Sequence, residues 1–168
     1  DSAIIGFNVL PLISLRTVGE VGTISDLNHV WREIEFSESL DNAVIIAGPA
    51  TSNDREPTSI RIRNVTKNGF EIRLVNASSA ANHDKEKVDW LAVEKGKWQL
   101  ADGTTVEAGS ILTNKVLKAG FSETVPLTNY IKIPVVLSQI NSFSNSIYLN
   151  SRITSVTRTS FSFALDPA

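Results

Sequence analysis

The sequence predicts an all-β fold, an antiparallel β-sandwich made of two tandem related repeats of about six strands each. Three observations lead to this prediction. Apolar and polar residues alternate with a period of two in many short segments, whereas helical periodicity is almost absent. The hairpin dipeptide Asn68-Gly69 separates two such segments. The second half of the chain repeats the residue types of the first half at a constant offset.

The predicted hairpin joins segments 60–63 and 70–74, in which apolar residues alternate with charged ones. Asn68 and Gly69 both tolerate the positive φ that a tight turn requires. Folding the chain about Lys67 gives two apolar and two charged cross-strand pairs: Ile62–Ile72, Ile60–Leu74, Arg63–Glu71 and Arg61–Arg73. We expect the apolar pairs to face the core and the charged pairs to face outward.

The internal repeat relates residues 43–74 to residues 134–165 without a gap, at an offset of 134 − 43 = 91. Upstream, residues 20–24 resemble residues 107–111 at an offset of 107 − 20 = 87, so the intervening loops differ by four residues. Inward positions match in type while outward positions differ. This pattern is expected of a shared core with diverged surfaces.

These offsets predict a first repeat over residues 20–100 and a second, truncated repeat over residues 107–168. The first repeat contains a predicted strand at 88–94 whose counterpart the second repeat lacks. The segment 1–13 has a similar apolar rhythm. Either this segment closes the second repeat as its last strand, or the chain is one section of a longer array. Closure is favoured because it avoids an open sheet edge.

The composition is that of a globular protein and excludes several partner classes. The 168 residues are 42% hydrophobic and 20% charged, which is enough apolar material for a core. The net charge of −2 and the lack of a basic run argue against a nucleic-acid partner. No apolar run approaches the roughly 20 residues of a membrane helix, so we expect no membrane span. The chain has no cysteine, which suits a secreted or cell-surface protein in an oxidising compartment.

The sequence offers no catalytic or metal-binding pattern. His29 and His83 are its two histidines, and neither lies in a metal-ligand motif. The nucleophile motif GxSxG is absent, and a glycosidase would need two carboxylates at a set separation that sequence cannot show. We therefore expect a non-enzymatic protein with no cofactor and no metal.

Several segments resemble the H-type lectin domain family, known from snail agglutinins and the discoidin C-terminal module. The resemblance covers roughly residues 22–94, and more loosely the second repeat as far as Leu165. It rests on these strings: IEFS at 34–37, AVII at 43–46, IRIRNVT at 60–66, GFEIRL at 69–74 and VDWLA at 88–92. Most of these positions are core and turn residues, so the resemblance bears more on the fold than on sugar binding.

The resemblance implies a six-stranded antiparallel sandwich, often trimeric, that binds N-acetylgalactosamine-type sugars in clefts between protomers. It also implies a homo-oligomer with a trimer-like seam, unless the tandem chain replaces that seam with an intramolecular one. The second repeat departs from the first at four outward hairpin positions: Arg152, Thr154, Ser162 and Ala164. If the outward face binds a ligand, the two repeats do not bind it equally.

Four residues on the outward face of the hairpin form the first candidate ligand-binding cluster: Arg61, Arg63, Glu71 and Arg73. Their guanidinium groups can hold sugar hydroxyls, sulfates or carboxylates. The simpler and favoured interpretation is a solvated sheet surface with one ion pair worth about 0.2–1 kcal/mol. Trp31 also points outward, because Ile34 and Phe36 define the buried face. It either stacks on a sugar ring or, as we favour, fills a seam between repeats.

The loop at residues 51–57 provides a second candidate cluster. Asn53, Asp54 and Arg55 offer the mixture of hydrogen-bond donors and acceptors that a sugar requires. Loops on a rigid β scaffold carry function more often than its strands do. The loop lacks the spaced carboxylates of a recognised calcium site.

The sequence thus favours a carbohydrate-binding, lectin-like module of a secreted or cell-surface protein, with a glycan or polysaccharide as its partner. The alternative is a structural or adhesive β-sandwich repeat that mediates protein–protein assembly and binds no sugar. Loss of sugar binding in Arg61→Ala or Arg63→Ala, at an unchanged melting temperature, would favour the first hypothesis.

Overall fold

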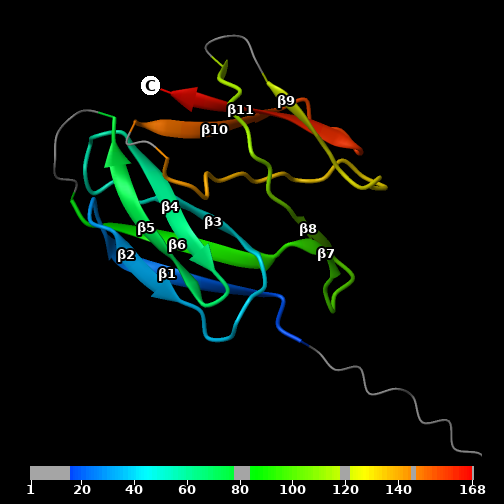
Figure 1. The fold of residues 1–168 in the computed structure, drawn as a ribbon, viewed down its shortest axis with the longest axis horizontal. Helices are drawn as coiled ribbons and strands as arrows, with labels where there is room; N and C mark the ends of the chain where they lie inside the picture. Colours follow the sequence, from blue (N-terminus) through cyan, green and yellow to red (C-terminus); the bar gives the residue numbers. More distant parts are fainter. Residues whose placement is uncertain (1–15, 78–83, 118–121, 145–146, 168) are drawn as a thin grey trace, which may run out of the picture.

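The computed structural model describes residues 16–77, 84–117, 122–144 and 147–167 (Figure 1). This part of the chain contains eleven strands in several antiparallel sheets and no α-helix. The predicted fold class is therefore confirmed. The segment 1–13, for which the sequence predicts a closing strand, lies outside the described residues.

Six strands form a two-sheet sandwich, which we call the first unit. One sheet has the order β1-β6-β3, with bounds Gly19–Leu27, Glu86–Glu94 and Ala43–Ala50. The other has the order β2-β5-β4, with bounds Arg32–Glu35, Gly69–Asn76 and Thr58–Thr66. In β6 every second residue is buried, as the period of a strand with one face on a core requires.

The β4-β5 hairpin has the predicted register. All four predicted cross-strand pairs occur: Ile62–Ile72, Ile60–Leu74, Arg63–Glu71 and Arg61–Arg73. A bulge between Arg63 and Thr66 precedes the turn and places Asn64 at a φ of 49°. Gly69 is required by a close approach of β2, since a Cβ there would lie 2.1 Å from the carbonyl oxygen of Ile34.

The core of the first unit lies between its two sheets. Eleven buried apolar residues form it: Ile24, Leu27, Leu40, Ile45, Ile62, Phe70, Ile72, Leu74, Val88, Trp90 and Ala92. Trp90 lies in this core, because it is 7% exposed and its ring centroid lies 5.3 Å from that of Phe70. The Trp90 ring also lies against Gly22 of β1, where a Cβ would approach it to 2.5 Å. Gly22 therefore makes room for the tryptophan.

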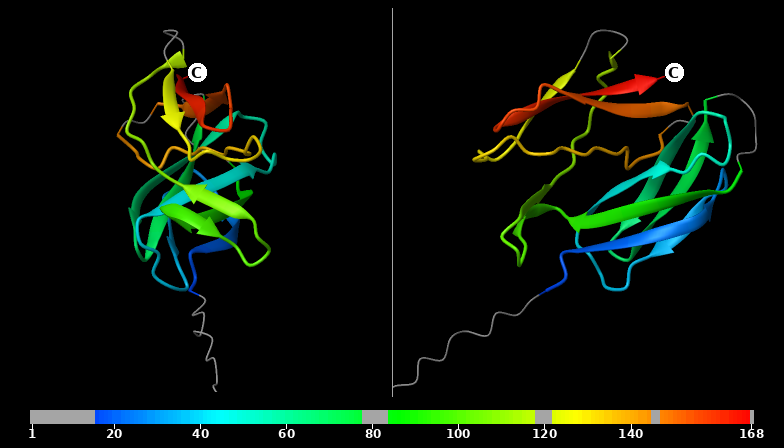
Figure 2. Two further views of the ribbon diagram at one scale, coloured as in Figure 1. Left: turned by 90° about the vertical axis from the view of Figure 1, so that its right-hand side faces the viewer. Right: turned by 180° about the vertical axis from the view of Figure 1, so that it is seen from behind.

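We call residues 96–167 the second unit. In it, β7 (Gly96–Gln99) and β8 (Thr105–Ala108) form a two-stranded hairpin. A second sheet has the order β10-β11-β9, with bounds Leu149–Thr154, Ser160–Pro167 and Glu123–Pro126. Figure 2 shows this sheet stacked on one side of the first sandwich, with an extended segment running between the two.

The β10-β11-β9 sheet has the same register as β4-β5-β2 at the predicted offset. The strands β9 and β11 begin and end 91 residues after β2 and β5. The pair Ile34–Phe70 thus corresponds to Val125–Phe161. The positive φ at this position also recurs, since Asn64 has a φ of 49° and Ser155, 91 residues later, a φ of 52°. The two sheets therefore share backbone geometry as well as sequence pattern.

The rest of the second unit departs from the prediction of about six strands. Segment 134–141, the sequence counterpart of β3, is not a strand, and the described residues contain no counterpart of β6. In the first unit β3 forms its ladder with β6, and a segment without a ladder partner is not held as a strand. Apolar side chains are exposed as a result: Ile131 is 93% exposed, whereas its counterpart Leu40 is 0% exposed. The repeat boundaries at 20–100 and 107–168 stay a prediction.

Residues within segments 139–143 and 147–149 contact the first unit, and we call this contact the seam. The side-chain amide of Asn141 donates to the carbonyl of Ile45 and accepts from its N–H, both at 2.9 Å. Gln139 donates to the carbonyl of Ile60 at 2.9 Å. Because Ile45 and Ile60 lie on the edge strands β3 and β4, the seam bonds backbone groups that an open sheet edge would leave unpaired.

Candidate functional site

The outer face of the β4-β5 hairpin brings five predicted site residues together. The strand register places four of them there: Arg61, Arg63, Glu71 and Arg73. Trp31 contacts Arg63 and Arg73 from the loop before β2. Phe143 of the second unit contacts Arg61 and Arg73. The sequence analysis missed Phe143. Its signal was weak, a single aromatic residue in the polar run 142–146.

Guanidinium groups and aromatic rings are packed together on this face. The Arg63 guanidinium lies 4.0 Å from the centroid of the Trp31 ring. Arg73 contacts both rings, at 4.7 Å from Trp31 and 4.6 Å from Phe143, and Arg61 lies 4.8 Å from Phe143. The two rings meet edge to face with their centroids 5.1 Å apart. Cations over aromatic faces are stabilised by the ring quadrupole, more strongly where water is excluded.

Arg61 is the most buried member of this arginine cluster, with 1% of its surface exposed. Its guanidinium donates to the carbonyl oxygens of Ile147 at 2.8 Å and Ser142 at 3.3 Å. Burial, and then repulsion from Arg73, lowers the pKa of Arg61. The interpretation of this face as a solvated sheet surface is therefore wrong for Arg61, because the second unit covers it.

Glu71 supplies the negative charge of the arginine cluster. Its carboxylate accepts hydrogen bonds from Arg63, at 2.8 Å from Nε and 2.6 Å from Nη2, and from the side chain of Asn64. These bonds, that from Asn64 first, lower the pKa of Glu71. Burial, and then the charge of Arg63, lowers the pKa of Arg73. Three guanidinium groups against one carboxylate leave the cluster positively charged.

The centre of the arginine cluster is closed to a large ligand. The Nε atoms of Arg61 and Arg73 are buried, and no hydrogen-bond partner for them lies in the described part of the chain. Arg63 keeps 36% of its side chain exposed. A ligand arriving from solvent would therefore meet the Arg63 edge of the stack and not its middle.

The loop residues Asn53, Asp54 and Arg55 form a separate polar cluster. The backbone N–H groups of Asn53 and Asp54 donate to the carboxylate of Glu86, at 2.9 and 3.0 Å, and the Asn53 side chain donates to the Lys85 carbonyl at 2.7 Å. Glu86 is 0% exposed, whereas Arg55 is exposed. These bonds lead to the start of β6 and not to the arginine cluster, so the structure does not join the two predicted sites.

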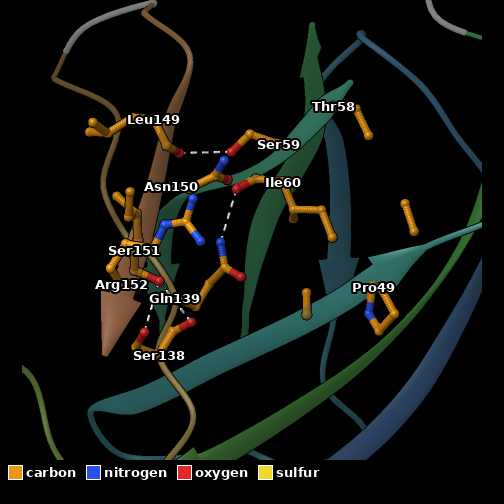
Figure 3. Close-up of a pocket in the computed structure, with 13 residues that line it drawn as sticks. Pro49, Thr58, Ser59, Ile60, Ser138, Gln139, Leu149, Asn150, Ser151 and Arg152 are labelled. Atoms are coloured by element: carbon orange, nitrogen blue, oxygen red, sulfur yellow. Dashed lines mark hydrogen bonds between the residues drawn. The ribbon is translucent and has the colours of Figure 1, made fainter. Parts of the chain in front are cut away.

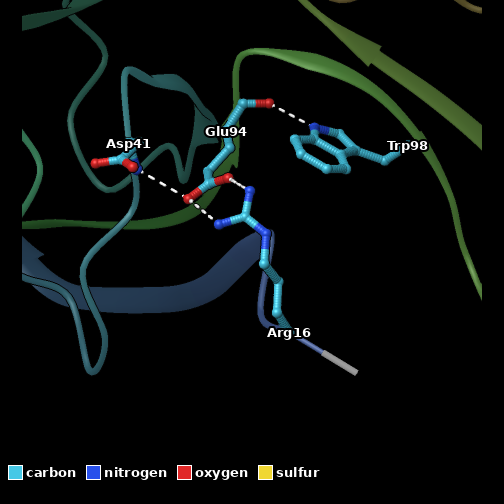
Figure 4. Close-up of polar contacts among 4 residues, drawn as sticks. All are labelled: Arg16, Asp41, Glu94 and Trp98. Carbon is cyan, nitrogen blue, oxygen red and sulfur yellow. Dashed lines mark hydrogen bonds and ion pairs between the residues drawn. The ribbon is translucent and has the colours of Figure 1, made fainter. Parts of the chain in front are cut away.

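A second buried carboxylate, Glu94, lies at the other end of β6 (Figure 4). It accepts hydrogen bonds from the Arg16 guanidinium and, at 2.9 Å, from the backbone N–H of Asp41. Its own carbonyl accepts from the indole N–H of Trp98 at 2.8 Å, and Arg16 lies 5.1 Å from the Trp98 ring centroid. The sequence analysis missed Glu86 and Glu94, although the alternation of β6 places both on its buried face.

A polar groove of about 450 Å³ lies between the two units (Figure 3). Strands β3 and β4 line one side, and β10 with residues 138–140 lines the other. Hydroxyl, amide and guanidinium side chains line it: Thr58, Ser59, Ser138, Gln139, Asn150, Ser151 and Arg152. The Ser59 hydroxyl crosses the groove to the Leu149 carbonyl at 2.8 Å. No aromatic ring is among the residues that line the groove.

Other kinds of site have less support in the structure. No group of three or more His, Asp or Glu side chains that could hold a metal ion occurs among the described residues. His29 is half-buried, and His83 lies outside the described residues. In the ranges that the structure describes, we find no helix long and apolar enough to cross a membrane.

Comparison with known proteins gives one informative likeness. No protein-family model and no solved structure matches the chain. The chain is 30% identical over 118 residues to Halomucin from Haloquadratum walsbyi (strain DSM 16790 / HBSQ001). The match includes 65% of the chain and spans about 1% of the length of Halomucin.

Proposed function

We propose that the chain is a non-catalytic structural repeat of a secreted or cell-surface protein, whose β-sandwich units assemble through protein–protein seams. The burial of Arg61 carries this proposal. The guanidinium at the centre of the predicted sugar-binding cluster is 1% exposed and bonded to carbonyl oxygens of the second unit. A side chain with these contacts is not available to a sugar.

The chemistry of the seam supports a structural role. Hydrogen bonds that involve a charged group contribute about 1.5–3 kcal/mol each, and a desolvated cation–π contact about 2 kcal/mol. Arg61 makes two such bonds across the seam, and its guanidinium also contacts Phe143. Two domains of one chain are expected to move relative to each other unless their interface is strong. A seam of this kind suits units that must keep a fixed orientation.

The extracellular location rests on sequence. The chain is similar over 118 residues to a protein whose name, Halomucin, denotes a mucin. The lack of cysteine fits an oxidising compartment. Because the chain spans about 1% of the length of Halomucin, the likeness supports a module within a larger protein more than any activity of the whole.

A ligand titration tests the proposal. In the structural role, neither N-acetylgalactosamine nor an acidic polysaccharide changes the melting temperature of the chain. A bound sugar at a hundred times its dissociation constant would add about 2.7 kcal/mol to the free energy of unfolding, which raises the melting temperature measurably. A saturable rise that Arg63→Ala abolishes would refute the structural proposal and restore a sugar-binding arginine cluster.

Carbohydrate binding in the groove is the second candidate function. The groove side chains favour it, because amides, hydroxyls and a guanidinium are the groups that hold sugar hydroxyls. Asn150→Ala would then remove the signal of a glycan array, whereas Asn129→Ala, at an exposed asparagine outside the groove, would not. Equal signals from the two variants would exclude the groove as the binding site.

A further inference from the structure

Two hydrogen-bonded contacts hold the ends of β1 against the opposite sheet, and both recur in the second unit. At the start of β1, Glu20 accepts hydrogen bonds from the N–H and the hydroxyl of Ser37, at 2.8 and 3.0 Å. In the second unit, Glu107 accepts from the N–H and the hydroxyl of Thr128, at 3.4 and 2.7 Å. Glu107 and Thr128 are the counterparts of Glu20 and Ser37 at the offsets of 87 and 91 residues.

The contact at the other end of β1 recurs with the same offsets. The Leu74 N–H donates to the Asn28 carbonyl at 2.8 Å, and the Leu165 N–H donates to the Lys115 carbonyl at 2.9 Å. The segment that begins with β8 and ends at Lys115 therefore contacts the β9-β11 sheet at the same two points at which β1 contacts the β2-β5 sheet. This segment holds the place of β1 in the second unit, although it is a strand only in β8.

In the first unit β1 pairs with β6, whereas β8 has an edge with which no described strand pairs. The Glu94 N–H donates to the Val18 carbonyl at 2.8 Å, so Val18 and alternate residues after it bond to β6. Their counterparts, 87 residues later, begin at Thr105. The Leu100 N–H donates to the Thr104 carbonyl at 2.8 Å, so β8 bonds to β7 through Thr104 and alternate residues after it. The series that begins at Thr105 therefore directs its backbone groups to the opposite side, where β6 would pair.

Neither the backbone conformation nor the described neighbouring atoms require a glycine at position 109. The φ of Gly109 lies outside the left-handed range, and a Cβ there would meet no described atom within 4 Å. Its counterpart Gly22 is required, since a Cβ there would come within 2.5 Å of the Trp90 ring. Nearby, Ile111 is 44% exposed, whereas its counterpart Ile24 is 3% exposed. The second unit thus keeps the glycine that accommodates an aromatic ring, beside an apolar side chain that a strand like β6 would bury.

We propose that the unpaired edge of residues 105–111 binds an extended strand donated by another polypeptide, with apolar side chains at alternate positions and an aromatic ring over Gly109. The pattern comes from the first unit, where β6 presents Val88, Trp90 and Ala92 to the core at this register. Strand addition supplies backbone hydrogen bonds along the edge, while the alternate side chains supply specificity. All eleven described strands of the chain already lie in sheets, so we assign the donated strand to another molecule. The proposal rests on the structural role proposed above and names the partner of one seam.

A synthetic peptide with the sequence of β6, residues 86–94, is the probe for this edge. A dye-labelled peptide is expected to bind the full chain saturably, as measured by fluorescence anisotropy. The same peptide with Trp90→Ala is the matched control. It is expected to bind about tenfold more weakly or worse, because a central aromatic side chain carries much of the binding energy of an interface. Absence of saturable binding at about 1 mM peptide, or equal binding of the two peptides, would overturn the proposal.

Two variants of the chain test whether the peptide binds at this edge. Gly109→Val is expected to weaken binding of the β6 peptide about tenfold or more, since its side chain fills the place of the aromatic ring. Ser110→Val, at the exposed neighbouring position, is the matched control and is expected to leave the affinity unchanged. The melting temperatures of both variants without peptide are the control for folding. Equal affinity of the two variants would show that the peptide binds elsewhere and would refute the assignment.

Hydrogen exchange measured by NMR locates the bound peptide on the unmodified chain. The amides of Thr105, Glu107 and Gly109 are expected to exchange about tenfold more slowly or less with peptide bound, because they lie on the side that the added strand pairs with. The amides of Val106 and Ala108, which face β7, are the internal control and are expected to change less. Peptide-induced protection that leaves Thr105, Glu107 and Gly109 unchanged would contradict strand addition.

Two readouts separate this proposal from the structural role on which it rests. A peptide that fails to bind, while N-acetylgalactosamine leaves the melting temperature unchanged, refutes strand donation and not the structural role. A saturable rise of the melting temperature with sugar refutes the structural role itself, whatever the peptide does.

Discussion

Phe70 and Phe161 hold the same register position, 91 residues apart, in matching three-stranded sheets. Phe70 is 2% exposed and packs against Trp90, with 5.3 Å between ring centroids, whereas Phe161 is half-buried. The difference comes from the opposite layer, since the first unit has β6 above this position and the described second unit does not. Local pattern is thus sufficient to pair strands, but a second layer is required to bury them.

The outer faces of the two units differ as well. Arg61 is buried in the seam, while its counterpart Arg152 keeps 63% of its side chain exposed and pairs with Asp166 at 2.6 Å. Trp31 has Ser122 as its counterpart, so the second unit lacks the aromatic side of the stack. The outer face of the first unit therefore has the arginine and aromatic side chains that pack against the second unit. The corresponding face of the second unit lacks this arrangement.

The comparison of the two cores predicts the largest effect. Phe70→Ala should lower the free energy of unfolding by about 3–5 kcal/mol, because it empties a closed core. Phe161→Ala should cost less than half as much, because the side chain already contacts solvent. Urea unfolding of the full chain measures both. Equal losses would mean that the second core is as closed as the first.

The comparison of the two outer faces predicts a smaller effect. Arg61→Ala should cost about 2–4 kcal/mol, since it leaves two seam carbonyls without their charged donor. Arg152→Ala should cost at most about 1 kcal/mol, as expected of an exposed ion pair. Thermal unfolding of the two variants provides the measurement. A harmless Arg61→Ala would remove the basis for a structural seam.

The smallest predicted effect concerns pH. Hydrogen bonds from Asn64 and Arg63 hold the pKa of Glu71 below its ordinary value, so the unfolded chain takes up this proton first on acidification. The contribution of Glu71 is complete at neutral pH and is lost as the pH falls through the ordinary carboxyl range toward the lowered pKa. Glu71→Gln should therefore be less stable at neutral pH and lose less stability by about pH 4.

Melting temperatures of Glu71→Gln and the unmodified chain, compared across this pH range, test the prediction. Glu38→Gln, at an exposed loop position, is the control. The counterpart of Glu71 in the second unit is Ser162, which does not titrate. If Glu71→Gln and the unmodified chain lose stability in parallel, the carboxylate makes no net contribution in the folded chain.

Much of the candidate site was predictable, and the missing part has a clear origin. Register placed Arg61, Arg63, Glu71 and Arg73 on one face, because that placement follows from the period of a strand and one turn. The cover over them was not predictable. Phe143 reaches Arg61 from 82 residues away, and no period or motif links the two positions.

The sequence by itself determined the strand pairs of both hairpins, the offset between the units and the buried face of β6, since each depends on neighbours along the chain. Only the tertiary structure decided that Phe143 covers the arginine cluster, that the backbone N–H of Asn53 donates to Glu86, and that Ile131 is exposed. These facts depend on which surfaces meet after the strands have paired. Packing between units is set by side-chain contacts over long sequence separations, and the alternation of apolar and polar residues along a strand does not predict these contacts.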